Sequence, residues 1–226
     1  MTTIRAVVFD VGETLVDETA AWDDWADWLG VPRFTFQAVL GGVIARGLDH
    51  RVAFELIRPG IDLDAQHRAR HAAGRRSTVT VDDFYPDALP CLRSLVDTGY
   101  RVGIAANQPA ATEAVLSALD VPLALVASSA RWRVAKPDPA FFVRICDELE
   151  LPPDQIAYVG DRLDNDIEPA TAAGMTAILV RRGPWAMLQT AGRDPDASGA
   201  FAMIESLAEL PDVLSRLGPR SAPGSP

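Results

Sequence analysis

The strongest constraint on the fold is a regular alternation of short apolar runs with helix-like stretches. Near-continuous runs of Val, Ile and Ala are typical of strands buried on both faces, and helices between such strands are the usual connections of a parallel sheet. Strands are predicted over 4–9, 100–106, 156–160 and 176–182, with 123–128 as a fifth candidate, and helices over 89–98, 110–119, 139–149 and 167–173. We therefore predict an α/β fold built on a parallel sheet.

Residues 17–85 interrupt this alternation. The segment contains no strand-like run, and helical periodicity is present over 19–29, 35–46, 51–57 and 64–73. We interpret 17–85 as an all-helical insertion after the first strand, with residues 1–16 and 86–217 forming the core that contains the sheet. Residues 218–226 are rich in Pro, Gly and Ser, and we expect a disordered tail there.

Composition and charge narrow the classes of partner. The chain has 226 residues, of which 48% are hydrophobic, and 21 basic residues stand against 31 acidic ones for a net charge of −10. A chain this acidic is not expected to bind nucleic acid. No window approaches the roughly 18 apolar residues of a membrane span, and the N-terminus has no signal-peptide pattern. We expect a cytoplasmic monomer or homodimer that acts on a small molecule and does not bind membranes.

Polar side chains follow several of the predicted strands at the point where each strand ends, and a lysine lies in a loop ahead of the fourth. These residues are Asp10, Asn107, Lys136, Asp161, Asp164 and Asp166. The carboxyl ends of parallel strands meet at one edge of a sheet, which is where ligands bind. A single Asp after a strand more often makes a turn or a helix cap. Several carboxylates together repel one another unless a hard divalent cation joins them, so their joint position predicts a Mg²⁺ site.

Four motifs, in order, make the sequence similar to the haloacid dehalogenase superfamily, which consists mostly of phosphatases. The apolar strand followed by DxDGT that begins the family pattern reads AVVFDVGET from Ala6, and the second motif reads GIAANQ from Gly103. The third, a Lys before Pro, reads AKPDPAFF from Ala135, and the fourth, GDxxxxD, reads VGDRLDND from Val159. The resemblance covers nearly the whole chain. It implies a Rossmann-like α/β core, with the helical insertion acting as a mobile cap.

The resemblance also implies roles for particular residues. Asp10 would be the nucleophile that takes a phosphoryl group from a phosphomonoester or acyl phosphate, forming an aspartyl phosphate. Lys136 would hold nucleophile and phosphate together, and Asn107 would bind phosphate oxygens. The implied Mg²⁺ ligands are the carboxylate of Asp10, the carbonyl of Gly12, and Asp161, with Asp166 in support.

Two positions depart from the family pattern. Phosphatases of the family carry a second Asp two residues after the nucleophile, which protonates the leaving group and later activates water, but this chain has Gly12 there. Such acid-base help is typically worth about 10² to 10⁴ in rate. The hydroxyl position of the second motif is Ala106. Either the substrate's leaving group needs no proton, or the enzyme is a slow phosphatase. Alternatively, Glu13 or a cap residue such as Asp17 or Glu18 replaces the missing carboxylate.

Two further alternatives stay open from the sequence. Dehalogenases of the superfamily also lack the second Asp, because a halide leaves without a proton, and they use no metal. The acidic loop 161–166 argues against that chemistry, because a haloacid carboxylate would meet uncompensated negative charge there. The other alternative is a non-catalytic binding protein that has kept the fold.

Overall fold

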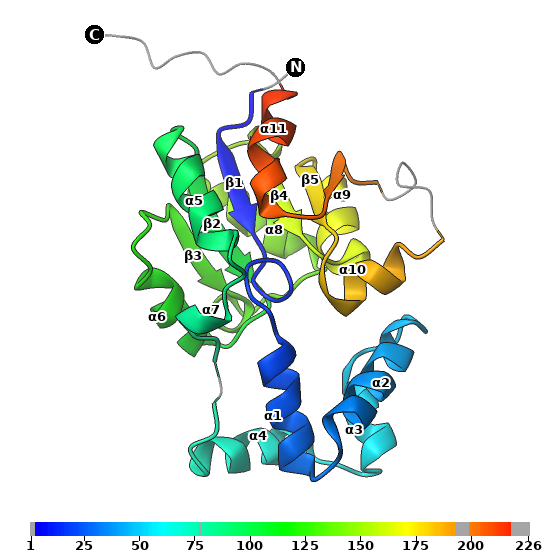
Figure 1. Cartoon of the computed structure of the whole chain (residues 1–226). Coiled ribbons are helices and arrows are strands. Elements are labelled where there is room, and N and C mark those ends of the chain that lie inside the picture. Colours follow the sequence, from blue (N-terminus) through cyan, green and yellow to red (C-terminus); the bar gives the residue numbers. More distant parts are fainter. Residues whose placement is uncertain (1–2, 77, 193–198, 218–226) are drawn as a thin grey trace, which may run out of the picture.

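Six parallel strands form one sheet in the computed structural model, which describes residues 3–76, 78–192 and 199–217. Their order across the sheet is β3-β2-β1-β4-β5-β6 (Figure 1). The strands are β1 (Ala6–Phe9), β2 (Arg101–Ala106), β3 (Leu125–Ser128), β4 (Ile156–Gly160), β5 (Thr176–Val180) and β6 (Ala202–Ile204). The predicted parallel α/β fold is confirmed. Sequence reasoning found the first five strands and missed β6, because three residues are too few to show a pattern.

Helices cover both faces of this sheet. The helices of the sheet-containing part are α5 (Ala88–Asp97), α6 (Ala110–Ser117), α7 (Ser129–Trp132), α8 (Pro139–Leu149), α9 (Glu168–Ala172), α10 (Gly183–Gln189) and α11 (Leu210–Ser215). The alternation of side chains along a strand explains the two layers. In β1, Val7 and Phe9 belong to a cluster shared with α5, α6 and α11, whereas Ala6 and Val8 belong to a cluster shared with α8 and α9.

Four helices follow β1 and lie beyond its carboxyl end (Figure 1). They are α1 (Thr19–Leu29), α2 (Arg33–Ile44), α3 (Arg51–Ile57) and α4 (Leu63–Ala72). Their apolar side chains form a third cluster that includes Phe36 and Phe54. Trp185 of α10 also belongs to this cluster, so one side chain of the sheet-containing part packs among the inserted helices.

Within the insertion, the helices lie close to their predicted bounds, and α1 and α3 begin and end at the predicted residues. The expected tail at 218–226 lies outside the described residues, and the division into a core and a cap at 17–85 stays a prediction. Within the described part of the chain, no helix combines the length and the apolar character needed to cross a membrane.

Candidate active site

Two neighbouring strands in the middle of the sheet position the first two acidic residues. β1 ends at Phe9 and β4 ends at Gly160, and Phe9 lies beside Val159 in the ladder. Asp10 and Asp161 come directly after these ends, and the amide of Asp10 donates a hydrogen bond to the Val159 carbonyl at 2.9 Å. The two carboxylates therefore meet at the carboxyl edge of the sheet, as predicted for the ligand-binding edge.

Lys136 brings a positive charge to the same place. Its Nζ lies 2.6 Å from Oδ1 of Asp10 and 2.5 Å from Oδ1 of Asp166, and the lysine side chain has no exposed surface. Burial acts to lower the pKa of Lys136, but the charges of Asp10 and Asp166 outweigh it and hold that pKa well above its usual range. The lysine is therefore a permanent cation facing the proposed nucleophile.

Asn107 fixes the backbone from which this lysine extends. The side-chain Nδ2 of Asn107 donates to the carbonyl of Lys136, and its Oδ1 accepts from the amide of Lys136, both at 2.9 Å. Asn107 also lines the cavity beside Asp10. Its observed contacts thus position Lys136, whereas the expected contact with phosphate oxygens stays a prediction.

Three carboxylates form a compact buried group. Asp10, Asp161 and Asp166 each offer one oxygen, and these oxygens all lie within 4.8 Å of one another. Burial and the charges of Asp166 and Asp10 raise the pKa of Asp161 well above its usual range. Burial and the charge of Asp10 raise the pKa of Asp166 to about 6, against the opposing effect of Lys136. If all three were ionised, they would carry more negative charge than one lysine balances, which is part of the reason these pKa values rise.

This donor set fits a hard divalent cation. Oδ2 of Asp161 is buried and accepts no hydrogen bond from the described residues, although an unpartnered buried oxygen is costly. Mg²⁺ prefers oxygen ligands of this kind, with waters completing its shell. Among the described residues, Asp10, Asp161 and Asp166 could therefore hold Mg²⁺, and the ion would supply the missing positive charge.

Asp164 does not join this group, although the sequence suggested that it would. Its Oδ1 accepts hydrogen bonds from Nε of Arg162 at 3.1 Å and Nε2 of Gln189 at 2.8 Å. The Asp164 side chain is 54% exposed, whereas that of Asp166 is fully buried. The expectation of a fourth carboxylate at the site was wrong, because the helical segment 163–167 turns Asp166 inward and Asp164 outward.

The carboxylate of Glu18 lies over Gly12. A Cβ atom built on Gly12 would lie 2.6 Å from Oε1 of Glu18 and 2.8 Å from its Cδ, which is closer than real contacts allow. Burial, followed by the negative charges of Glu13 and Asp10, raises the pKa of Glu18 to about 8. A carboxyl group from the start of the insertion therefore fills the space that a side chain at position 12 would occupy.

Glu13, the substitute acid named from the sequence, has other contacts. Its Oε2 accepts a hydrogen bond from the Tyr85 hydroxyl at 2.6 Å, and its Oε1 accepts one from the Glu18 amide at 3.1 Å. Glu13 is 5% exposed and has a φ of 51°, in the left-handed region. These contacts make Glu13 an anchor for the turn after β1. Tyr85 was missed from the sequence, because nothing near position 85 signals its partner.

A cavity of about 380 Å³ opens next to these residues. Asp10, Gly12, Asp161 and Arg162 line it on the side of the sheet. The inserted helices contribute aromatic and basic side chains, namely Trp22, Trp25, His50, Arg51, Phe54 and His67. Two of the three tryptophans spaced along α1 thus face the cavity. The cavity suits a small molecule that has apolar surface.

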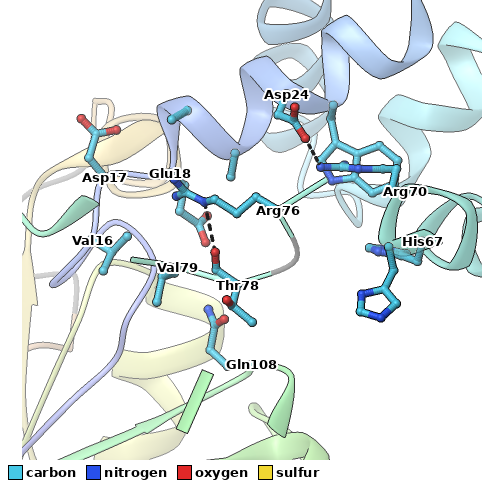
Figure 2. Close-up of a pocket in the computed structure, with 14 residues that line it drawn as sticks. Val16, Asp17, Glu18, Asp24, His67, Arg70, Arg76, Thr78, Val79 and Gln108 are labelled. Atoms are coloured by element: carbon cyan, nitrogen blue, oxygen red, sulfur yellow. Dashed lines mark hydrogen bonds and ion pairs between the residues drawn. The ribbon is translucent and has the colours of Figure 1, made fainter. Parts of the chain in front are cut away.

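A second cavity of about 370 Å³ adjoins the first, and Glu18 lines both (Figure 2). Arg70 and Arg76 lie on its walls, but each already has an acidic partner. Nη2 of Arg70 lies 2.5 Å from Oδ2 of Asp24, and Arg76 pairs with Asp83. Both arginines that line the second cavity are therefore already paired with a carboxylate.

Comparison with known proteins now decides the family. A family model described as haloacid dehalogenase-like hydrolase matches residues 4–174. The chain belongs to this family. It is therefore a hydrolase of the haloacid dehalogenase superfamily, as its motifs indicated.

Similar proteins include phosphatases and dehalogenases. A phosphoglycolate phosphatase of Rhodospirillum rubrum is 30% identical over 93% of this chain and 90% of its own length. A glyceraldehyde 3-phosphate phosphatase of Methanopyrus kandleri is 32% identical, but the match spans only 59% of this chain and 57% of that protein. The crystal structure of a 2-haloacid dehalogenase from Pseudomonas syringae has a TM-score of 0.59 with 25% identity, over 96% of this chain and all of that one.

Proposed function

We propose that this haloacid dehalogenase-like hydrolase is a Mg²⁺-dependent phosphatase that acts on a small phosphomonoester or acyl phosphate through an aspartyl phosphate at Asp10. The observation that carries the proposal is the buried group of Asp10, Asp161, Asp166 and Lys136 at the end of β1 and β4. The phosphatase relative that matches nearly the full length supports the choice of reaction.

Each residue of the group has a separate role in this proposal. Oδ1 of Asp10 is paired with Lys136, so the other oxygen is the one available to attack phosphorus. Lys136 contacts Asp10 at 2.6 Å and would attract the phosphate dianion. Asp161 and Asp166 would hold Mg²⁺ together with Asp10 and the carbonyl of Gly12. When bound, the ion would neutralise charge on the transferring phosphoryl oxygens.

We also propose that residues 17–85 act as the cap over this site. Helices α1 and α3 and the segment near His67 line the cavity opposite Asp10, so they are placed to contact the substrate. A cap that closes over the cavity would exclude bulk water during phosphoryl transfer. The aromatic side chains there favour a substrate with an apolar part.

Dehalogenation is the competing reaction, because dehalogenases share the fold and position 12 carries no acid. The site electrostatics disfavour it. A haloacid carries its own carboxylate, and it would approach Asp161 and Asp166, which already exceed the charge of Lys136. The test of function therefore includes a haloacid without metal.

The proposal is tested by measuring phosphate release from p-nitrophenyl phosphate and acetyl phosphate, with and without Mg²⁺. Neither leaving group needs a proton, so the missing acid at position 12 does not slow the first step, the transfer of the phosphoryl group to Asp10. We expect turnover only with metal, and at least a thousandfold loss in Asp10→Asn. Asp164→Asn is the matched control: it removes an exposed carboxylate of the same loop and should retain activity within about threefold. Turnover of 2-haloacids without metal, and none of phosphates, would overturn the proposal.

Metal binding is tested separately from activity by thermal unfolding. At a Mg²⁺ concentration about 100 times its Kd, binding stabilises the folded state by about 2.7 kcal/mol. For a chain of this size, that corresponds to a rise in Tm of about 5 to 10 °C. Asp161→Asn should remove most of this rise, and Asp164→Asn should keep it. An equal rise in both variants would contradict the assignment of Asp161.

A further inference from the structure

The carboxyl group of Glu18 lies where the side chain of residue 12 would be. All three atoms of its carboxyl group lie within 3.1 Å of the point where a Cβ on Gly12 would stand. Gly12 is two residues from Asp10, and Asp10 and Glu18 line the same cavity. A carboxyl group is therefore present beside the proposed nucleophile, although the sequence has none at position 12.

The backbone of Glu18 is held from both sides. Its amide donates to Oε1 of Glu13 at 3.1 Å, and its carbonyl accepts hydrogen bonds from the amides of Ala21 and Trp22 at 2.9 and 3.0 Å. Glu13 is in turn held by Tyr85. The side chain thus extends from a fixed point between the turn after β1 and the first turn of α1, and it reaches the cavity as Figure 2 shows.

The neighbouring carboxylates are engaged elsewhere. Both oxygens of Glu13 accept hydrogen bonds, from Tyr85 and from the Glu18 amide. Asp17 is exposed, and its Oδ1 accepts a hydrogen bond from the amide of Thr19, the first residue of α1, at 2.8 Å. Of the three candidate substitutes that follow Gly12, Glu18 is the one whose carboxyl group lies over it.

We propose that Glu18 is the catalytic acid and base of this enzyme, acting from the start of the insertion in place of a side chain at position 12. The inference rests on the proposed phosphatase function. In the first step an Asp10 oxygen bonds to phosphorus, the bond from phosphorus to the ester oxygen breaks, and the Glu18 carboxyl gives its proton to the leaving alkoxide. In the second step the Glu18 carboxylate takes a proton from water while the water oxygen bonds to phosphorus. The bond to Asp10 then breaks, releasing inorganic phosphate and restoring both side chains.

Glu18→Gln separates the two steps, because p-nitrophenolate leaves without a proton whereas the hydrolysis of the intermediate needs a base. With p-nitrophenyl phosphate and Mg²⁺, we expect a burst of about one nitrophenolate per chain, followed by a steady rate about 10² to 10⁴ lower than in the unchanged enzyme. Mass spectrometry of the acid-quenched protein should show a phosphoryl group on Asp10. The matched control is Asp17→Asn, which removes the adjacent carboxylate and should show neither burst nor accumulation.

The outcomes distinguish this inference from the proposed function. If the unchanged enzyme releases no phosphate from any substrate, the proposed function fails. If it does, and Glu18→Gln turns over at the same rate or slows without accumulating phosphorylated Asp10, the role of Glu18 is wrong. A purely structural role would slow both steps together and leave no burst.

Moving the carboxylate gives a second test. Gly12→Asp alone places a Cβ against the Glu18 carboxyl, and we expect it to impair turnover. In the double variant Gly12→Asp with Glu18→Ala, the space is vacated and a carboxylate again lies beside Asp10. The double variant should turn over at least tenfold faster than Glu18→Ala. If the double variant is no faster than Glu18→Ala, a carboxyl group at this position does not supply the acid and base, and the inference is wrong.

Discussion

Gly183, at the start of α10, packs directly against the turn that follows β1. Its φ is +71°, and a Cβ built on it would lie 2.5 Å from Oε2 and 2.6 Å from Cβ of Glu13. The Cβ contact belongs to the base of the Glu13 side chain and not only to its flexible end. Gly183→Ala should therefore strain its own backbone and also displace Glu13.

The cost has two parts. An L-residue in the left-handed region loses about 1 to 2 kcal/mol relative to glycine. Forcing extra volume against a buried neighbour costs about 1 to 3 kcal/mol more, and Glu13 is 5% exposed. The free energy of unfolding should fall by about 2 to 5 kcal/mol in total. Phosphatase turnover should also fall, because Glu13 holds the amide of Glu18.

Gly174→Ala is the matched control. Gly174 also has a positive φ, of +86°, but its Cβ would meet only Pro153 at 3.5 Å, which is ordinary contact. This variant should lose only the backbone part, about 1 to 2 kcal/mol, with unchanged turnover. Urea unfolding of both variants, followed by circular dichroism, measures the difference. Equal losses of stability in the two variants would refute the packing argument.

Two further predictions concern ion pairs, one partly buried at Asp87 and one buried at Lys136. Burial acts to raise the pKa of Asp87, but hydrogen bonds from Arg182 and Ser206 outweigh it, so the pKa lies below its usual range. Asp87→Asn should lower the free energy of unfolding by about 3 kcal/mol at pH 7. A carboxyl group whose pKa is lowered in the folded state stabilises that state only above the pKa of the unfolded chain, which is about 4. The difference in free energy of unfolding between the unchanged protein and Asp87→Asn should therefore shrink in urea titrations below about pH 4. A difference that stays constant would contradict the pairing of Asp87 with Arg182. Lys136→Met leaves two buried carboxylates without their cation and should cost about 3 to 5 kcal/mol, less with Mg²⁺ present; a loss that Mg²⁺ does not reduce would argue against metal at this site.

Most of the fold could be predicted because its signals are local. Apolar strands and amphipathic helices are visible within windows of about ten residues, and α1, α3, α8 and β4 occur with the predicted bounds. Parallel strands also bring their carboxyl ends to one edge, so Asp10, Asp161 and Lys136 could be placed together before any coordinates. β6 was missed because three residues carry too little pattern.

The contacts that refine the site were beyond the sequence, since they depend on side-chain direction. Asp164 and Asp166 differ by two positions in one loop, and only the local backbone decides which one turns inward. The close approaches of Glu18 to Gly12 and of Glu13 to Gly183 depend on how the loops are folded. The periodicity of the sequence carries no information about them. Asn107 likewise contacts the Lys136 backbone through the pairing of two distant loops.

The central place of β1 in the sheet has a consequence for how the chain folds. Ala6, near the start of the chain, pairs with Arg101 on one side and with Ile156 on the other. Such distant pairings carry a large loop-closure entropy and slow folding. During synthesis, the strand that carries Asp10 has no complete set of partners until β4 has left the ribosome. Chains truncated before residue 156 should therefore expose β1 and be prone to aggregate.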